Sequence, residues 1–107
     1  MMTFNEYQEL AMRTANETGS RLMLNGALGL CGEAGEAADV VKKHFFQGHE
    51  LDKEDLKNEL GDVMWYIAVL AKSAHIDLAD IANGNIEKLK RRYPDGFSID
   101  KSVNRKE

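Results

Sequence analysis

The chain has 107 residues, with 14 basic and 18 acidic side chains and a formal net charge of −4 at pH 7. Its 43% hydrophobic and 30% charged residues are ordinary for a globular domain, and its length allows one domain with a core of its own. The negative charge gives no general attraction for a nucleic-acid polymer or an anionic membrane, and the longest apolar run, residues 63–71, is too short to span a bilayer.

The N-terminus has no basic stretch followed by an apolar one, so we expect no signal peptide. The chain has a single cysteine, Cys31, which can form no intrachain disulfide. Because Cys31 falls on an apolar arc of a predicted helix, we expect a buried thiol in a reducing cytoplasm.

The first predicted helix starts behind Thr3 and Glu6, which have the spacing of a capping box. Apolar residues then recur at helical spacing to about residue 16, and Gly19-Ser20 is expected to end the helix. Three polar residues lie away from the apolar stripe, and we expect them to face solvent, with contact to a bound base or sugar as the alternative. They are Gln8, Arg13 and Asn16.

A second helix is predicted over residues 25–46, with an apolar arc of Ala27, Leu30, Ala34, Ala37, Ala38, Val41 and Phe45. It contains Gly29, Gly32 and Gly35, each of which costs roughly 0.5–1 kcal/mol relative to alanine in a helix. These glycines indicate that another backbone or a ligand approaches closely, or that the helix has a short break.

A third helix is predicted from Lys53 to about residue 74, with Asp52 as its N-cap. Its apolar arc comprises Leu56, Leu60, Val63, Met64, Ile67, Leu70 and Ala71. Trp65 and Ala68 point away from this arc. We interpret an outward tryptophan as an anchor for a protein partner, rather than as a platform for a nucleobase.

Four carboxylates border these two arcs. Glu33 and Glu36 form an E-x-x-E pair, and Glu59 and Asp62 form an E-x-x-D pair, so each pair shares a helix face. The numbers 36 and 59 average to 47.5, as do 33 and 62, and Gly48 lies beside that midpoint. If the helices form an antiparallel hairpin, Glu36 faces Glu59 and Glu33 faces Asp62.

Four negative charges beside a core repel one another unless cations neutralise them. An all-oxygen site suits hard divalent ions, so we expect Mg²⁺, with Mn²⁺ as a substitute. The alternative is that these are ordinary solvated helix acids. Lys43, on the same side as Glu36, is expected to form a surface salt bridge, with a phosphate contact as the alternative.

A fourth helix is predicted over Leu78–Tyr93, with Asp77 as its cap, a buried stripe and Pro94 as its stop. The stripe comprises Leu78, Ile81, Ala82, Leu89 and Tyr93. Asn85, Lys88 and Arg92 share another face and can hold a polyphosphate, although cations in a last turn also complement the helix dipole. We expect one domain over residues 1–97, followed by a loose polar tail over residues 98–107.

These blocks resemble the MazG-like all-α nucleoside triphosphate pyrophosphohydrolases. The resemblance is carried by Gly32-Glu33-Ala34-Gly35-Glu36, by Glu59-Leu60-Gly61-Asp62-Val63 and by the block from Asn85 to Phe97, in that order. It implies an all-α fold of four main helices with a central acid-bearing hairpin, assembled as a homodimer or a homotetramer (a dimer of dimers).

The resemblance also implies a function: Mg²⁺-dependent cleavage of a nucleoside triphosphate to monophosphate and pyrophosphate. Glu33, Glu36, Glu59 and Asp62 would hold the metal and serve catalysis, and Asn85, Lys88 and Arg92 would bind the phosphates. The expected cellular role is removal of surplus or non-canonical nucleotides.

Two other functions compete with this interpretation. A di-iron carboxylate bundle needs Glu-x-x-His pairs, and no glutamate here is followed by histidine three residues later. A non-catalytic helical interaction module is the stronger alternative, and such a module would tolerate glutamine at any of the four acid positions.

Overall fold

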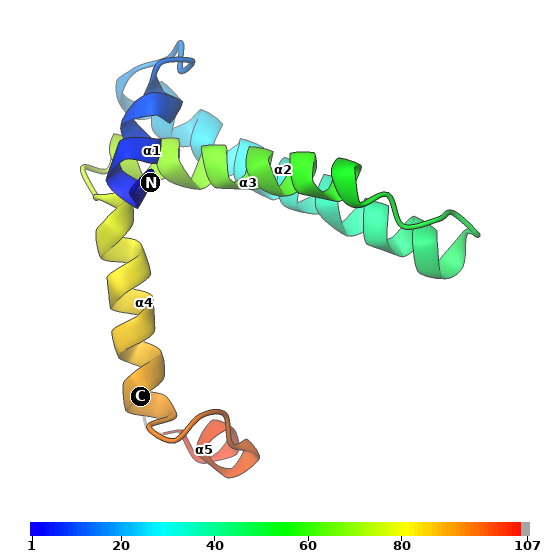
Figure 1. Cartoon of the computed structure of the whole chain (residues 1–107). Coiled ribbons are helices and arrows are strands. Elements are labelled where there is room, and N and C mark those ends of the chain that lie inside the picture. The colour runs from blue at the N-terminus through cyan, green and yellow to red at the C-terminus, as the bar shows by residue number, and fades with distance from the viewer. Residues whose placement is uncertain (106–107) are drawn as a thin grey trace.

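The computed structural model describes residues 1–105, and within them the chain is helical with no β-strand, which confirms the all-α prediction. The helices are α1 (Phe4–Met12), α2 (Gly19–Phe46), α3 (Lys53–Ser73), α4 (Leu78–Arg92) and α5 (Ile99–Val103) (Figure 1). None of the helices in this part of the chain combines the length and apolarity needed to cross a membrane.

Helices α2 and α3 form the most extensive helix–helix contact, and they run side by side in opposite directions (Figure 1). Gly48, in the short loop between them, has φ +75°, a backbone conformation that glycine adopts without strain. Of the three glycines singled out in the sequence of α2, Gly29 is required by packing, since a Cβ there would collide with the Tyr66 ring of α3. A Cβ at Gly32 or Gly35 would meet only open space.

Helix α1 covers a face of α3 that α2 leaves open. Ala11, Ala68 and Leu78 form a buried cluster there, with Trp65 packed against it. The indole Nε1 of Trp65 donates to the carbonyl oxygen of Ala11 at 3.0 Å and to Thr14 Oγ1 at 2.9 Å. The prediction that Trp65 and Ala68 point outward was therefore wrong, because the α3 face opposite its main arc is covered by α1 of the same chain.

Gln8 is also placed differently from the prediction of solvent exposure, because its side chain is only 1% exposed. Its Nε2 donates to the carbonyl oxygens of Ala68 at 3.1 Å and Ile76 at 3.0 Å, and its Oε1 accepts from Leu78 N at 3.1 Å. Gln8 thus joins α1 to the end of α3 and the start of α4, with its hydrogen-bonding groups satisfied.

The start of α4 is capped by α1 rather than by its own N-cap residue. Asn5 Oδ1 accepts from Ala79 N at 3.0 Å, next to the bond from Leu78 N to Gln8, whereas Asp77 makes no side-chain cap bond. The prediction of Asp77 as a side-chain cap was wrong, because two α1 side chains already satisfy the free N–H groups.

The caps and ends of the helices were predicted with mixed success. The Thr3–Glu6 capping box and the Asp52 cap are both confirmed. Helix α1 ends at Met12 rather than near residue 16, and α2 begins at Gly19, six residues before the predicted start. The predicted loose tail contains α5, whose Ser98 cap accepts from Lys101 N at 3.3 Å, and its last two residues lie outside the described part of the chain.

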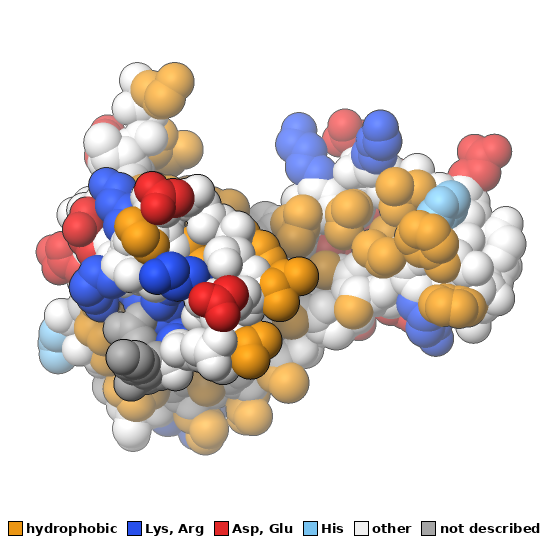
Figure 2. Space-filling model, turned by 90° about the horizontal axis from the view of Figure 1, so that it is seen from below, with side chains coloured by type: hydrophobic (Ala, Val, Ile, Leu, Met, Phe, Trp, Pro, Cys, Tyr) orange, Lys and Arg blue, Asp and Glu red, His pale blue; other side chains and the backbone are white. Residues whose placement is uncertain are grey.

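Much of the predicted apolar surface is not buried within one chain. Val41, Phe45, Leu60 and Met64 are exposed, and Cys31 is exposed too, so the prediction of a buried thiol was wrong. On α4, Ile81 and Leu89 are exposed and only Leu78 is buried. Figure 2 shows hydrophobic side chains gathered on the α2–α3 arm toward its loop end. The reason is that this arm protrudes toward its loop, where α2 and α3 pack only against each other within the described part of the chain, whereas α1 and α4 contact α3 near its other end (Figure 1).

Candidate metal centre

Three of the four predicted acids converge between α2 and α3. One carboxylate oxygen from each of Glu33, Glu59 and Asp62 lies within 4.8 Å of the others. Glu59 and Asp62 are three residues apart, so they project from one face of α3 toward Glu33 on α2. A set of three carboxylates is an oxygen-only donor group of the kind that hard divalent cations prefer.

The electrostatics of this cluster are unfavourable without a cation. The pKa of Glu59 is raised, first by burial, then by a hydrogen bond with Glu33 and by the negative charges of Glu33, Glu36 and Asp55. Among the ion pairs formed by the described residues, none neutralises Glu33, Glu59 or Asp62. The cluster therefore fits a divalent ion by both its donor chemistry and its uncompensated charge.

Glu36 lies outside the close group, although its charge contributes to the raised pKa of Glu59. Lys43 bonds Asp39 at 3.0 Å, and this pairing is the first cause of its raised pKa. The expected surface salt bridge of Lys43 is therefore present, with Asp39 as its partner. The charge of Glu36 also acts on Lys43 more weakly.

Tyr7 is a neighbour of the cluster that the sequence did not reveal. Burial raises the pKa of its phenol, and the negative charge of Asp62 raises it further. Tyr7 belongs to the apolar stripe of α1, so its helical spacing indicated only a core residue. Its proximity to Asp62 depends on how α1 crosses α3, for which no local signal exists.

The remaining predicted site residues, Asn85, Lys88 and Arg92, lie on α4. This helix packs against α1 and α3 and then extends away from the α2–α3 pair (Figure 1). Asn85 is exposed and Lys88 is half-buried. A single chain therefore does not bring these three residues to its own acid cluster.

Comparisons with known proteins agree with these motifs. The family model of the MazG nucleotide pyrophosphohydrolase domain matches residues 23–97, a range that contains the four acids and the polar residues of α4. The Gene 37 protein of Mycobacterium phage L5 is 41% identical over 73 residues, and the alignment covers 64% of this chain and 64% of that relative. The match thus spans less than two thirds of the relative's length. No solved structure matches the chain significantly.

Proposed function

Since the chain belongs to the MazG nucleotide pyrophosphohydrolase domain family, we propose that it hydrolyses a nucleoside triphosphate between the α- and β-phosphates. Water would add to the α-phosphorus while the bond between the α-phosphorus and the oxygen that bridges the α- and β-phosphates breaks. The products are a nucleoside monophosphate and pyrophosphate. The observation that carries this proposal is the convergence of Glu33, Glu59 and Asp62. The cellular role we propose is removal of surplus or non-canonical nucleotides.

Glu33, Glu36, Glu59 and Asp62 are the residues that would hold Mg²⁺, with Mn²⁺ as a substitute. Their oxygen-only chemistry and the absence of ion-pair partners for the close three, among the described residues, support this assignment. When bound, the ion would neutralise phosphate charge and lower the pKa of a water molecule. Glu36, which lies outside the close group, is the carboxylate we assign to accept a proton from the attacking water.

Asn85, Lys88 and Arg92 would bind the phosphates, and we propose that they do so in the site of a second copy. Helix α4 leads away from the acids of its own chain (Figure 1). Lys and Arg side chains gather over its far end (Figure 2). Helix α4 thus complements the acidic α2–α3 surface of a neighbouring copy, with a polyphosphate and its cation between them.

The shape of the chain supports a homo-oligomer. Its radius of gyration is 16.8 Å, whereas a compact chain of this length would have about 13 Å. Among residues 1–105, only seven apolar residues are buried: Ala11, Leu22, Ala37, Ala68, Val69, Ala71 and Leu78. A homodimer or homotetramer would cover the exposed apolar residues of α2, α3 and α4 and complete a core that one chain leaves open.

Pyrophosphate release tests this function directly. Purified protein is incubated with common and damaged ribo- and deoxyribonucleoside triphosphates, with Mg²⁺ or with EDTA. We expect pyrophosphate and monophosphate in equal amounts from at least one substrate, only with the metal, and almost none from Glu59→Gln. Full activity of Glu59→Gln, or release of inorganic phosphate in place of pyrophosphate, would contradict the proposal. A protein that cleaves nothing would favour the interaction module.

A further inference from the structure

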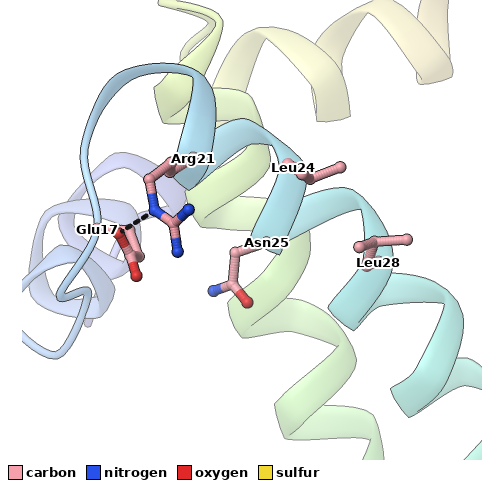
Figure 3. A pocket seen from close by; sticks show the side chains of 5 residues that line it. All are labelled: Glu17, Arg21, Leu24, Asn25 and Leu28. Carbon is pink, nitrogen blue, oxygen red and sulfur yellow. Dashed lines mark hydrogen bonds and ion pairs between the residues drawn. The ribbon is translucent and has the colours of Figure 1, made fainter.

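A pocket opens on the flank of α2 near its N-terminal end, away from the acid cluster. It has a volume of about 200 Å³ and is lined by Glu17, Arg21, Leu24, Asn25 and Leu28 (Figure 3). It therefore combines an ion pair, an amide and two apolar side chains within a space that suits a planar ring.

The polar groups of this pocket differ in how they are engaged. Arg21 Nε donates to Glu17 Oε2 at 3.1 Å, which holds the guanidinium at one wall. No hydrogen bond within the described part of the chain engages the Asn25 amide. Leu24 and Leu28 are 60% and 66% exposed, so they offer apolar surface next to that amide.

This combination matches a nucleobase better than it matches a phosphate or a sugar. A base has apolar faces and an edge of alternating donors and acceptors, and a planar asparagine amide can pair with such an edge in bidentate fashion. Small-molecule sites commonly combine apolar walls with one or two placed polar groups. The Glu17–Arg21 ion pair leaves this wall without net charge, so the pocket offers a phosphate no net electrostatic attraction.

The pocket lies on the same side of α2 as Glu36. Asn25 is eight residues from Glu33, a rise of about 12 Å and about 80° around the helix axis, and it lies within about 20° of Glu36 around that axis. Gly32 lies between Asn25 and Glu36, and a Cβ there would meet no atom, so the α2 backbone is bare at that position. This span is comparable with the length of a nucleotide from its phosphates to its base.

We propose that this pocket receives the nucleobase of the nucleoside triphosphate whose phosphates bind at the acids of the same chain, and that the Asn25 amide reads the base edge. The proposal rests on the proposed function, and it adds a specificity-determining residue to it. Asn25 donates and accepts, whereas aspartate at this position only accepts. Base preference therefore follows from the chemistry of this one side chain.

The test compares bases within each variant, because such ratios cancel general effects on metal or phosphate binding. Values of kcat/KM are measured for ATP, GTP, CTP, UTP and their deoxy counterparts, by pyrophosphate release. We expect Asn25→Ala to reduce the spread between the best and worst base about tenfold. Asn25→Asp should favour guanine, adenine and cytosine, whose amino groups donate to a carboxylate, over uracil, which presents one N–H between two carbonyl oxygens. Asn83→Ala, at an exposed α4 position, should keep the wild-type ratios.

Other results would overturn the proposal while leaving pyrophosphohydrolase activity in place. One such result is unchanged base ratios in both Asn25 variants, and another is a wild type that does not distinguish bases. A third is a changed oligomeric state of Asn25→Ala with unchanged base ratios, which would show that the pocket is a contact between subunits. If the wild type cleaves nothing, the proposed function fails. Equilibrium dialysis with AMP, GMP, CMP and UMP then decides, and the absence of Asn25-dependent binding would overturn the pocket as well.

Discussion

The carboxyl groups of Glu33 and Glu59 approach each other from facing helices, with oxygens within 4.8 Å. Burial, together with a hydrogen bond and charge repulsion from Glu33, raises the pKa of Glu59. Folding therefore favours the protonated form of this carboxyl. Its favourable contribution to stability is present below the ordinary pKa of glutamate and is lost as pH rises through the raised folded-state pKa.

The raised pKa of Glu59 determines how its replacement changes the stability of the metal-free protein. Glu59→Gln should raise the melting temperature at pH 7, where the native side chain is forced to be charged, and should leave it nearly unchanged at pH 4, where both side chains are neutral. Thermal unfolding in EDTA at both pH values measures the difference. A gain of equal size at pH 4 and pH 7 would show that charge is not its cause.

Added Mg²⁺ should make the wild type more stable than Glu59→Gln. A cation that binds only the folded state stabilises it by mass action, by about 2.7 kcal/mol at a hundredfold excess over its dissociation constant. Asp62→Asn should lose most of this gain. Glu87→Gln should keep it, because Glu87 is an exposed α4 acid whose ion-pair partner is Lys90. Calorimetry with and without Mg²⁺ provides the comparison, and an equal gain in all three proteins would exclude the cluster as the binding site.

Lys88 separates phosphate binding from simple complementation of the helix dipole. Lys88→Ala should lower kcat/KM at least about tenfold, or about 1.4 kcal/mol, if the ammonium contacts the triphosphate. Lys90→Ala is the matched control, since Lys90 projects from another face and lies 3.7 Å from Glu87. Mixing Lys88→Ala with Glu59→Gln subunits should restore activity if α4 of one subunit binds the phosphates at the acid cluster of another. Equal, near-wild-type values for both lysine variants would make the cationic face structural.

Gln8 should be far more important for stability than a surface glutamine. Gln8→Leu leaves the Ile76 carbonyl oxygen and the Leu78 N–H without a partner and removes a second bond from the helical carbonyl of Ala68, and each unsatisfied buried group costs about 1–3 kcal/mol. We expect a loss of at least about 2 kcal/mol in urea unfolding. Gln47→Leu, in the exposed α2–α3 loop, should change stability by less than about 0.5 kcal/mol. Similar values for the two variants would show that water replaces the lost bonds.

The two neighbouring glycines of α2 should respond to alanine with opposite signs. Gly32→Ala adds a methyl group into open space and should stabilise the helix by roughly 0.5–1 kcal/mol. Gly29→Ala places its methyl group into the Tyr66 ring, which must move, and should destabilise the protein. Denaturant unfolding of the pair measures this. A stabilised Gly29→Ala protein would mean that Tyr66 is free to turn away.

Features set by neighbours in sequence were predictable here. Thr3 and Glu6 reach each other across one helical turn, so residue type and spacing suffice to predict their bonds. Asp52 and Asp55 are related in the same way. Glu59 and Asp62 of α3 share a helix face for the same reason, so their spacing was enough to predict that these two carboxylates lie on one side, whereas Glu36 of α2 lies outside the close group.

Features set by a third helix were not predictable. Helical periodicity gives the angle of Trp65 relative to the other residues of α3, but it cannot indicate that α1 covers that side. The same holds for Gln8, whose partners are 60 to 70 residues away in the chain. An apolar arc likewise indicates that a surface is covered, without indicating whether the cover comes from the same chain, and Leu60 and Met64 show the difference.

The bonds of Gln8 have a consequence for how the chain is assembled during synthesis. Helices α2 and α3 are joined by a short loop and can pair as soon as both have been made, since nearby segments close with little loss of entropy. Helix α1 is translated before α2 and α3, yet the groups that Gln8 binds lie at Ala68, Ile76 and Leu78. Any nascent chain or fragment that ends before Leu78 therefore carries a first helix with no complete place to dock. Helix α1 is therefore translated before α2 and α3 but is fixed in place only after both.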